Sequence, residues 1–228
     1  MFKKQIKVSH MSPRGAKKVQ EFMVMERTIT LTVGSHQKEF ITTSTQRDDL
    51  VVGYLYLQGL DIEDKDIHWE EDHATIAHKI TQKREPVSLG EGPQVSYQEI
   101  CHLLSYFTEK AILYKDTSVT NSVALATSKE ILYFAEDLEP DQAFYKVMSQ
   151  AKSSQVDPKA YEGKVLITTG KVTVPWVEWC QQYGIPMIVS RFAPTDQAYE
   201  RAQEANLTIC GFARGTQFKV YTHKKRIS

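Results

Sequence analysis

The last quarter of the chain, residues 184–227, reads GIPMIVSRFAPTDQAYERAQEANLTICGFARGTQFKVYTHKKRI. Short apolar runs, typical of buried strands, alternate here with a segment whose apolar residues have helical spacing. The Pro194-Thr195 step is typical of the start of a helix. The pattern predicts, in order, strand Met187–Val189, helix Thr195–Ala205, strand Thr208–Gly211 and strand Phe218–Thr222. This stretch therefore predicts an α/β unit.

The same alternation extends upstream to residue 96. It predicts helix Ser96–Lys110, strand Val123–Ala126, strand Ile131–Phe134, helix Asp141–Ala151, strand Val165–Thr168 and helix Val174–Tyr183. Alternating helices and strands favour a layered α/β domain with a mostly parallel sheet.

The first half of the chain carries a different pattern. It predicts strands Thr28–Val33 and Glu39–Thr43, a helix that opens with a capping-box-like Thr45 and Asp48 and ends at Gly59, and a strand over Ala74–Ile80. Residues 1 to about 20 are basic with little apolar pattern, which is typical of an arm or an early edge segment.

Composition and charge narrow the functional classes. The chain has 228 residues, of which 41% are hydrophobic, and its 28 basic and 28 acidic side chains give a formal net charge of zero. No global field would recruit nucleic acid or an anionic membrane. Three widely spaced cysteines, a basic N-terminus with no apolar run after it, and no stretch of about 20 apolar residues favour a soluble, cytoplasmic protein.

Two segments near the C-terminus have the chemistry of a phosphate site. Arg191 and Arg214 offer guanidinium groups suited to phosphate, Ser190 and Thr195 offer hydroxyl groups, and Gly215 lets a ligand approach the backbone. A structural alternative is that Arg191 pairs with an internal carboxylate, that Thr195 is an N-cap, and that Gly211–Gly215 is a strand end and turn. On residue types alone, that alternative is the commoner case.

These segments also carry a family resemblance. Val189–Thr195, Leu207–Gly215 and Tyr221-Thr222 resemble the signature of the FdhD family of formate dehydrogenase accessory proteins in order, spacing and identity. Leu50–Leu60 resembles the family's N-terminal helix, and Thr169–Thr173 resembles its Ser-Gly-Arg-containing turn.

The resemblance implies a fold and a function. The fold is a cytidine-deaminase-like layered α/β domain over residues 96–228, with a smaller N-terminal α+β domain and connecting loop over 26–95 and a basic arm over 1–25, as a homodimer. The function is transfer of sulfur from a cysteine desulfurase to the bis-guanylyl molybdenum cofactor, for formate dehydrogenase. The residues implied to bind the cofactor's guanine-nucleotide ends are Ser190, Arg191, Ala193, Pro194, Thr195, Gly211, Phe212, Ala213, Arg214, Gly215 and Thr216.

The chain departs from the family where sulfur is carried. Residues 81–93, where the family has paired cysteines, contain none, although sulfur carriage requires a thiolate. Cys101, Cys180 and Cys210 all lie in apolar patterns and are predicted to be buried.

Two further family motifs are altered. Tyr114–Asn121 lacks the glycines and histidine of the family's Thr-Gly-Gly-x-His pattern. Glu136–Gln142 keeps the acidic pair of a Glu-Asp-Val-Gly-Arg-His-Asn pattern but lacks its arginine and histidine. Lys146 follows in the next predicted helix. We therefore predict cofactor binding, assign no catalytic residue and leave enzymatic activity open. The alternatives are a non-catalytic binding or chaperone module and an unrelated nucleotide-binding enzyme.

A zinc site is not predicted. His68-Trp69-Glu70 matches half of the zinc-deaminase signature, but the Pro-Cys-x-x-Cys half is absent from the sequence. His73 and His78 lie near Glu70, Glu71 and Asp72 at spacings that match no standard metal pattern, so a solvated strand and turn is the preferred interpretation.

Overall fold

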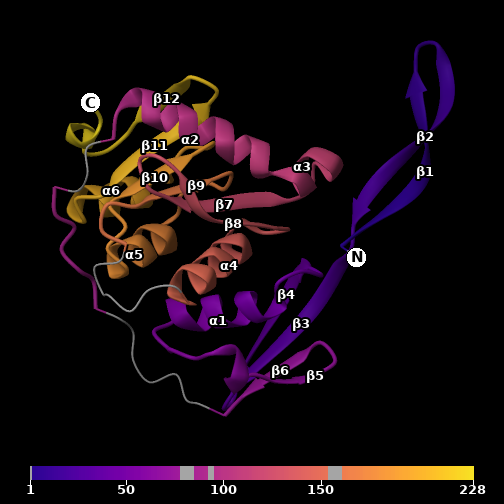
Figure 1. Cartoon of the computed structure of the whole chain (residues 1–228), viewed down its shortest axis with the longest axis horizontal. Coiled ribbons are helices and arrows are strands. Elements are labelled where there is room, and N and C mark those ends of the chain that lie inside the picture. Colours follow the sequence, from indigo (N-terminus) through magenta and orange to yellow (C-terminus); the bar gives the residue numbers. More distant parts are fainter. Residues whose placement is uncertain (1, 78–84, 92–94, 154–160) are drawn as a thin grey trace.

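A six-stranded sheet organises the larger part of the chain in the computed structural model, which describes residues 2–77, 85–91, 95–153 and 161–228 (Figure 1). In the order β12-β11-β10-β9-β7-β8, its strands are β7 Asn121–Ala126, β8 Ile131–Asp137, β9 Val165–Thr168, β10 Met187–Ser190, β11 Thr208–Arg214 and β12 Gln217–Val220. The predicted α/β class is confirmed.

The sheet is mixed, so the prediction of a mostly parallel sheet was wrong. Only the β9–β10 and β10–β11 pairs are parallel, whereas β11–β12, β7–β9 and β7–β8 are antiparallel. The reason lies in the connections. Residues 127–130 and 215–216 are too short for a crossover and allow only antiparallel neighbours, whereas α5 Val174–Gln182 and α6 Asp196–Glu204 supply the two parallel crossovers.

Helices cover both faces of this sheet. On one face, α2 Tyr97–Lys110 packs Leu103 and Phe107 against the alternate strand residues Val165 and Met187. The other face is covered by α4 Pro140–Ser153, α5 and α6, whose core includes Phe144 stacked on Trp176. Because β9 and β10 are buried on both faces, they are continuously apolar, which is the pattern that made them predictable.

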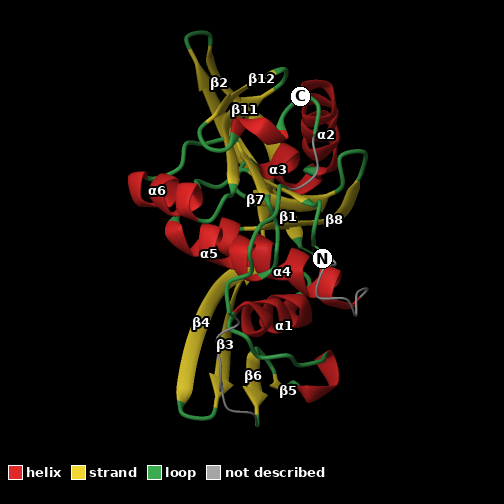
Figure 2. Cartoon of the chain, turned by 90° about the vertical axis from the view of Figure 1, so that its left-hand side faces the viewer, coloured by secondary structure: helices red, strands yellow, loops and turns green. Residues whose placement is uncertain are grey.

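A smaller sheet lies below α4. Its strands, in the order β4-β3-β6-β5, are β3 Glu26–Val33, β4 His36–Thr43, β5 His68–Glu70 and β6 His73–Ile76, with the short 3-10 helix η1 Asp64–Asp66 before β5. Figure 2 shows α1 Arg47–Leu57 between α4 and this sheet. The two helices meet closely, since a Cβ at Gly53 would lie 1.7 Å from the carbonyl oxygen of Tyr145. One apolar core therefore runs from the small sheet to the large one.

Two local predictions in this region were inexact. The helix α1 does not open with a capping box at Thr45; it begins at Arg47 behind Gln46, whose φ is 54° and whose side chain makes no cap hydrogen bond. The strand predicted over Ala74–Ile80 is β6, which begins at His73 and ends at Ile76; residues 78–80 lie outside the described part.

The N-terminal segment forms a β-hairpin that no pattern in the sequence predicted. Strands β1 Lys3–Ser12 and β2 Gly15–Val24 pair in antiparallel register and project from the body of the chain (Figure 1). Their base is held by an ion pair between Lys3 and Asp116, next to the short helix α3 Ile112–Thr117, which the sequence also did not predict. The chain ends in a second 3-10 helix, η2 Lys224–Arg226.

Candidate anion-binding cavity

A cavity of about 1060 Å³ opens at one edge of the large sheet, where β9, β10 and β11 end and β7 begins. The carboxyl ends of parallel strands are a common place for ligand sites in α/β proteins. The lining residues are Cys101, His102, Leu104, Ser105, Thr108, Glu109, Tyr114, Ser118, Val119, Thr120, Asn121, Thr169, Arg191, Phe192, Arg214, Gly215 and Thr216.

Two arginines give this cavity its charge. Arg191 follows β10 and donates from Nη2 to the Thr108 hydroxyl at 2.9 Å, and the Arg214 guanidinium, at the end of β11, lies 5.9 Å from the centre of the Phe192 ring. No carboxylate pairs with either arginine within the described residues. The predicted alternative of a carboxylate partner for Arg191 is therefore not seen there, and two guanidinium groups suited to an anion line the cavity.

The turn after β11 contributes open backbone. Gly215 has φ +56°, and a Cβ added to it would meet nothing within 4 Å. The next residue, Thr216, accepts a hydrogen bond from the Tyr97 hydroxyl through its carbonyl oxygen, and the Tyr97 ring stacks on Phe218. A ligand can thus approach the backbone of this turn while α2 and β12 hold the turn in place.

The opposite wall is formed by the segment that replaces a glycine-rich family motif. Without those glycines, the chain turns at Ser118, whose φ of 56° is in the left-handed region. Glu136 stabilises the segment, because its carboxylate accepts from the backbone N–H groups of Leu113 and Tyr114 at 2.9 and 2.8 Å and from the Thr120 hydroxyl at 3.1 Å. Glu136 therefore has a structural role here, because its carboxylate holds this segment in place.

A hydrogen-bond chain sets the floor of the cavity. The Thr169 hydroxyl donates to Asn121 Oδ1 at 3.1 Å and accepts from the Ser122 N–H at 2.9 Å, and Asn121 Nδ2 donates to the Leu138 carbonyl at 2.9 Å. These contacts join the ends of β7, β8 and β9. They fix the orientation of Asn121 and Thr169, which both line the cavity.

Four of the eleven predicted binding residues line this cavity: Arg191, Arg214, Gly215 and Thr216. The side chains of the other seven are engaged elsewhere or lie outside the lining. Ser190 is fully buried, with its hydroxyl donating to the Gly170 carbonyl at 2.6 Å and accepting from the Phe192 N–H at 2.9 Å. Thr195 caps α6 by accepting from the Ala198 N–H at 3.3 Å, as the structural alternative held.

The remaining five have packing roles. Pro194 forms an isolated bridge with Val172, and Ala193 is its half-buried neighbour. Gly211 lies under the Tyr221 ring, Ala213 is buried beneath α2, and Phe212 is exposed with the Lys219 ammonium 4.7 Å from its ring centre. A ligand-binding role for all eleven residues stays a prediction.

The cavity residues of α2 were missed from the sequence. Cys101, His102, Ser105 and Thr108 lie on the polar side of an amphipathic helix, where residue type alone does not distinguish a solvated face from a cavity wall. The one available signal was that Tyr114–Asn121, which also lines the cavity, corresponds to an altered family motif.

The three cysteines differ in access. Cys180 and Cys210 are fully buried, as predicted, and burial raises the pKa of both thiols, that of Cys210 to about 12. The prediction that Cys101 is buried was wrong: it is half-buried and lines the cavity, next to the Tyr97 hydroxyl, whose pKa is raised by the hydrogen bond with Cys101. On α2, Cys101 lies outside the apolar face that Ile100, Leu103 and Leu104 pack into the core.

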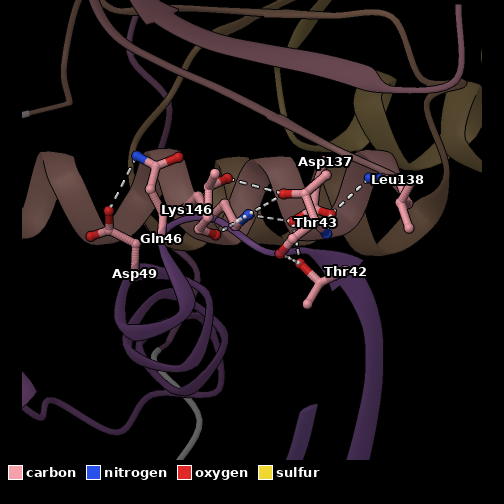
Figure 3. Close-up of polar contacts among 8 residues, drawn as sticks. Thr42, Thr43, Gln46, Asp49, Asp137, Leu138 and Lys146 are labelled. Carbon is pink, nitrogen blue, oxygen red and sulfur yellow. Dashed lines mark hydrogen bonds and ion pairs between the residues drawn. The ribbon is translucent and has the colours of Figure 1, made fainter. Parts of the chain in front are cut away.

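Two other residues of the family-like segments form a buried ion pair outside the cavity lining (Figure 3). Lys146 Nζ lies 2.6 Å from Asp137 Oδ2, and both side chains are 0% exposed. Asp137 also accepts from the Thr42 hydroxyl and from the backbone N–H groups of Thr43 and Leu138, at 2.7, 2.9 and 2.7 Å. Since burial lowers the pKa of Lys146, its charge depends on this carboxylate. The pair joins β4 to β8 and α4.

The histidines near β5 and β6 have partners other than a metal ion among the described residues. On β5, the exposed His68 Nε2 lies 3.5 Å from Glu70 Oε1, and His73 Nε2 is hydrogen-bonded to the Thr32 hydroxyl at 2.9 Å. His78 lies outside the described residues.

Comparison with known proteins identifies the family. The model of the FdhD/NarQ family matches residues 70–228. The chain belongs to the FdhD/NarQ family. Relatives named "Sulfur carrier protein FdhD" include one from Wolinella succinogenes, 32% identical over 59% of this chain and 46% of that protein, and one from Listeria innocua, 26% identical over 87% of this chain and 89% of that protein. The chain therefore spans about half of the first relative and most of the second.

A solved structure shares the fold of this FdhD/NarQ member. A crystal structure from Desulfotalea psychrophila, whose proposed assignment is a formate dehydrogenase accessory protein, aligns over 100% of both chains with a TM-score of 0.82 and 17% identity. At that identity the likeness shows the fold alone. None of the helices within the described residues is long and apolar enough to cross a membrane.

Proposed function

We propose that this FdhD/NarQ protein is an accessory factor for formate dehydrogenase maturation that binds a guanine-nucleotide end of the bis-guanylyl molybdenum cofactor in the cavity. The observation that carries this proposal is the convergence of Arg191 and Arg214 on one cavity, although the two residues are 23 positions apart in the sequence. With no carboxylate partner among the described residues, both guanidinium groups can pair with phosphate oxygens.

The remaining lining residues fit a nucleotide. A volume of about 1060 Å³ is at the upper end of the range for a single ligand, which is enough for one nucleotide end. The hydroxyls of Ser105 and Thr216 and the amide of Asn121 offer the hydrogen bonds that a purine and a ribose require. Phe192 lines the cavity with 48% of its surface exposed and offers a ring for base stacking.

The recipient and the sulfur donor are proposed from the family. Formate dehydrogenase would receive the cofactor and a cysteine desulfurase would supply sulfur, as the family resemblance implies, and the relatives' name, sulfur carrier protein, supports the carriage of sulfur. The cytidine-deaminase-like character of the larger domain is part of the same proposal. No residue is assigned a catalytic role, because residues 81–93 contain no cysteine.

Titration of the full-length protein with GDP tests the cavity. We expect saturable binding that Arg191→Ala and Arg214→Ala each weaken by about 10- to 100-fold, the equivalent of one charge-assisted hydrogen-bonding group. Arg201→Ala is the matched control, because Arg201 lies on α6 and donates to Gln181 at 2.7 Å, away from the cavity. Absence of binding at millimolar GDP would overturn the proposal and leave the binding or chaperone module as the better hypothesis.

A second experiment asks whether sulfur is carried at all. After incubation with a cysteine desulfurase and labelled cysteine, we expect no stable persulfide on this chain, because Cys180 and Cys210 are sealed in the core. Cys101 is the one cysteine of the three that solvent can reach, so label recovered on Cys101 would contradict this expectation and identify the chain as a sulfur carrier.

A further inference from the structure

Arg191 is held at both ends of its side chain by contacts within the chain. At the backbone end, its N–H donates to the Thr168 carbonyl at 3.1 Å. The buried Ser190 hydroxyl braces the same turn, because it donates to the Gly170 carbonyl at 2.6 Å. At the other end, the guanidinium donates from Nη2 to the Thr108 hydroxyl at 2.9 Å. The direction of this guanidinium is therefore set by the chain itself.

The Thr108 hydroxyl is oriented to accept this hydrogen bond. Thr108 lies on α2 and donates its hydroxyl proton to the Leu104 carbonyl, one turn earlier in the helix, at 2.8 Å. A hydroxyl has a single donor hydrogen, so only its lone pairs are left for the guanidinium, which can only donate. With its proton engaged, Thr108 has no donor for a phosphate oxygen, although it lines the cavity. Its place there suits a support for Arg191 better than a contact to the ligand.

Arg214 has no such support among the described residues. Its guanidinium lies 5.9 Å from the centre of the Phe192 ring, and no hydrogen bond from it is seen in the described part of the chain. An unsupported arginine loses rotamer freedom when it binds an anion, whereas a side chain already held in place loses less. The two arginines of the cavity are therefore not equivalent, and Arg191 is the preorganised one.

We propose that Thr108 is a positioning residue that orients the Arg191 guanidinium toward a phosphate group of the ligand, and that Arg214 supplies the adaptable second contact. This inference rests on the proposed function, since the ligand is the nucleotide end assigned to the cavity. It adds a residue that lies 83 positions from Arg191 in the sequence and acts on the ligand only through that arginine. Loss of the Thr108 hydroxyl should then weaken nucleotide binding.

Titration of the full-length protein with GDP tests this role. Thr108→Val removes the hydroxyl and keeps the branched shape and a similar helix propensity, and we expect it to raise the dissociation constant about 3- to 10-fold, as the loss of one hydrogen bond would. Thr108→Ser keeps the hydroxyl and should stay within about twofold of the unaltered chain.

Thr208→Val is the matched control. The Thr208 hydroxyl makes the same pair of hydrogen bonds, since it donates to the His223 carbonyl at 3.0 Å and accepts from Arg226 Nη1 at 3.1 Å. Thr208 lies at the opposite end of β11 from Arg214 and outside the cavity lining. Its replacement should therefore leave the dissociation constant for GDP within about twofold of that of the unaltered chain.

A double-mutant cycle separates support of Arg191 from direct contact with the ligand. If Thr108 acts through Arg191, Thr108→Val should weaken GDP binding by less than about 1.5-fold once Arg191 is alanine. In the Arg214→Ala chain, where Arg191 is intact, the full effect of Thr108→Val should remain. An equal loss in the unaltered and Arg191→Ala chains would mean that Thr108 contacts the ligand itself, and would overturn the proposal.

A measurement without nucleotide keeps this inference apart from the proposed function. Phenylglyoxal modifies arginine side chains, and mass spectrometry follows Arg191 and Arg214 separately. Thr108→Val should speed the modification of Arg191 at least about twofold, because its guanidinium is released, and should leave that of Arg214 unchanged. GDP binding by the unaltered chain that Thr108→Val does not weaken would overturn this inference alone. Absence of GDP binding would overturn the proposed function, and an unchanged modification rate at Arg191 would then overturn the positioning role as well.

Discussion

Removal of the Lys146 ammonium should be among the costliest single changes in this chain. Lys146→Met keeps the length and apolar stem of the side chain but leaves the Asp137 carboxylate without its cation, at a site where both groups are 0% exposed. It also removes the donor to the Thr43 hydroxyl at 3.1 Å and to the Thr45 carbonyl at 2.8 Å.

The expected loss follows from the geometry of the pair. Breaking a buried ion pair from one side costs about 3–5 kcal/mol. Asp137 keeps three hydrogen-bond donors, from Thr42, Thr43 and Leu138, so the lower end of that range applies, about 3 kcal/mol. With an m value of about 2–3 kcal/mol/M, the urea midpoint should fall by about 1 M or more.

Urea unfolding at neutral pH, followed by circular dichroism, measures this loss. Lys152→Met is the matched control on the same helix, because its partner Asp61 is 72% exposed and such a pair contributes less than about 1 kcal/mol. Asp137→Asn/Lys146→Met should be more stable than Lys146→Met alone, since a neutral amide needs no cation and its oxygen can still accept the backbone N–H groups.

Two outcomes would refute this reasoning. The first is a loss for Lys146→Met no greater than that for Lys152→Met, which would mean that the buried charge is not held by its partner. The second is a double variant no more stable than Lys146→Met, which would place the cost in lost packing and not in an uncompensated carboxylate.

Three further predictions concern packing, access and pH. Gly53→Ala should lower the free energy of unfolding by about 3 kcal/mol, because the new Cβ meets backbone atoms of Tyr145 and α1 must move away from α4. In the same urea titration, the control Gly90→Ala should leave the free energy of unfolding nearly unchanged, because a Cβ at Gly90 meets no atom within 4 Å. Iodoacetamide added to the native protein should label Cys101 and spare Cys180 and Cys210, as measured by mass spectrometry, and saturating GDP should slow the labelling of Cys101. Equal labelling of all three cysteines would contradict the burial of Cys180 and Cys210. Since burial raises the pKa of the Cys180 and Cys210 thiols, the unfolded chain loses these protons first, and the free energy of unfolding should fall above about pH 9 by up to about 1.4 kcal/mol per pH unit for each thiol. Cys180→Ala/Cys210→Ala should show a shallower decline between about pH 8.5 and 10.5, and an unchanged slope would show that these thiols do not titrate as their burial requires.

The secondary structure of the α/β part was accessible from the sequence because its signals are local. Strand β9 begins and ends at the predicted residues, and the predicted helices over Ser96–Lys110 and Thr195–Ala205 differ from α2 and α6 only by their capping residues. Apolar periodicity and the polar residues that end a helix act over a few positions, so they can be read without the fold. The FdhD/NarQ resemblance, carried by Val189–Thr195 and Leu207–Gly215, was equally local and is confirmed.

The hairpin and the strand directions were not accessible in this way. Residues 3–24 have no alternating pattern strong enough to predict strands, since both faces of a projecting ribbon meet solvent and neither must be apolar. The antiparallel pairing of β7 with β9 depends on which strand lies beside which, a choice made by the packing of α4 across β8 and β7.

The sequence by itself therefore determined the family, the α/β class and the presence of two arginines suited to an anion. Only the tertiary structure decided that Arg191 and Arg214 face one cavity, that Ser190 is consumed by a turn, and that Cys101 is accessible while Cys180 and Cys210 are not. The reason is physical. Whether a polar group is free for a ligand depends on which distant segment satisfies its hydrogen bonds, and that pairing exists only once the chain has folded.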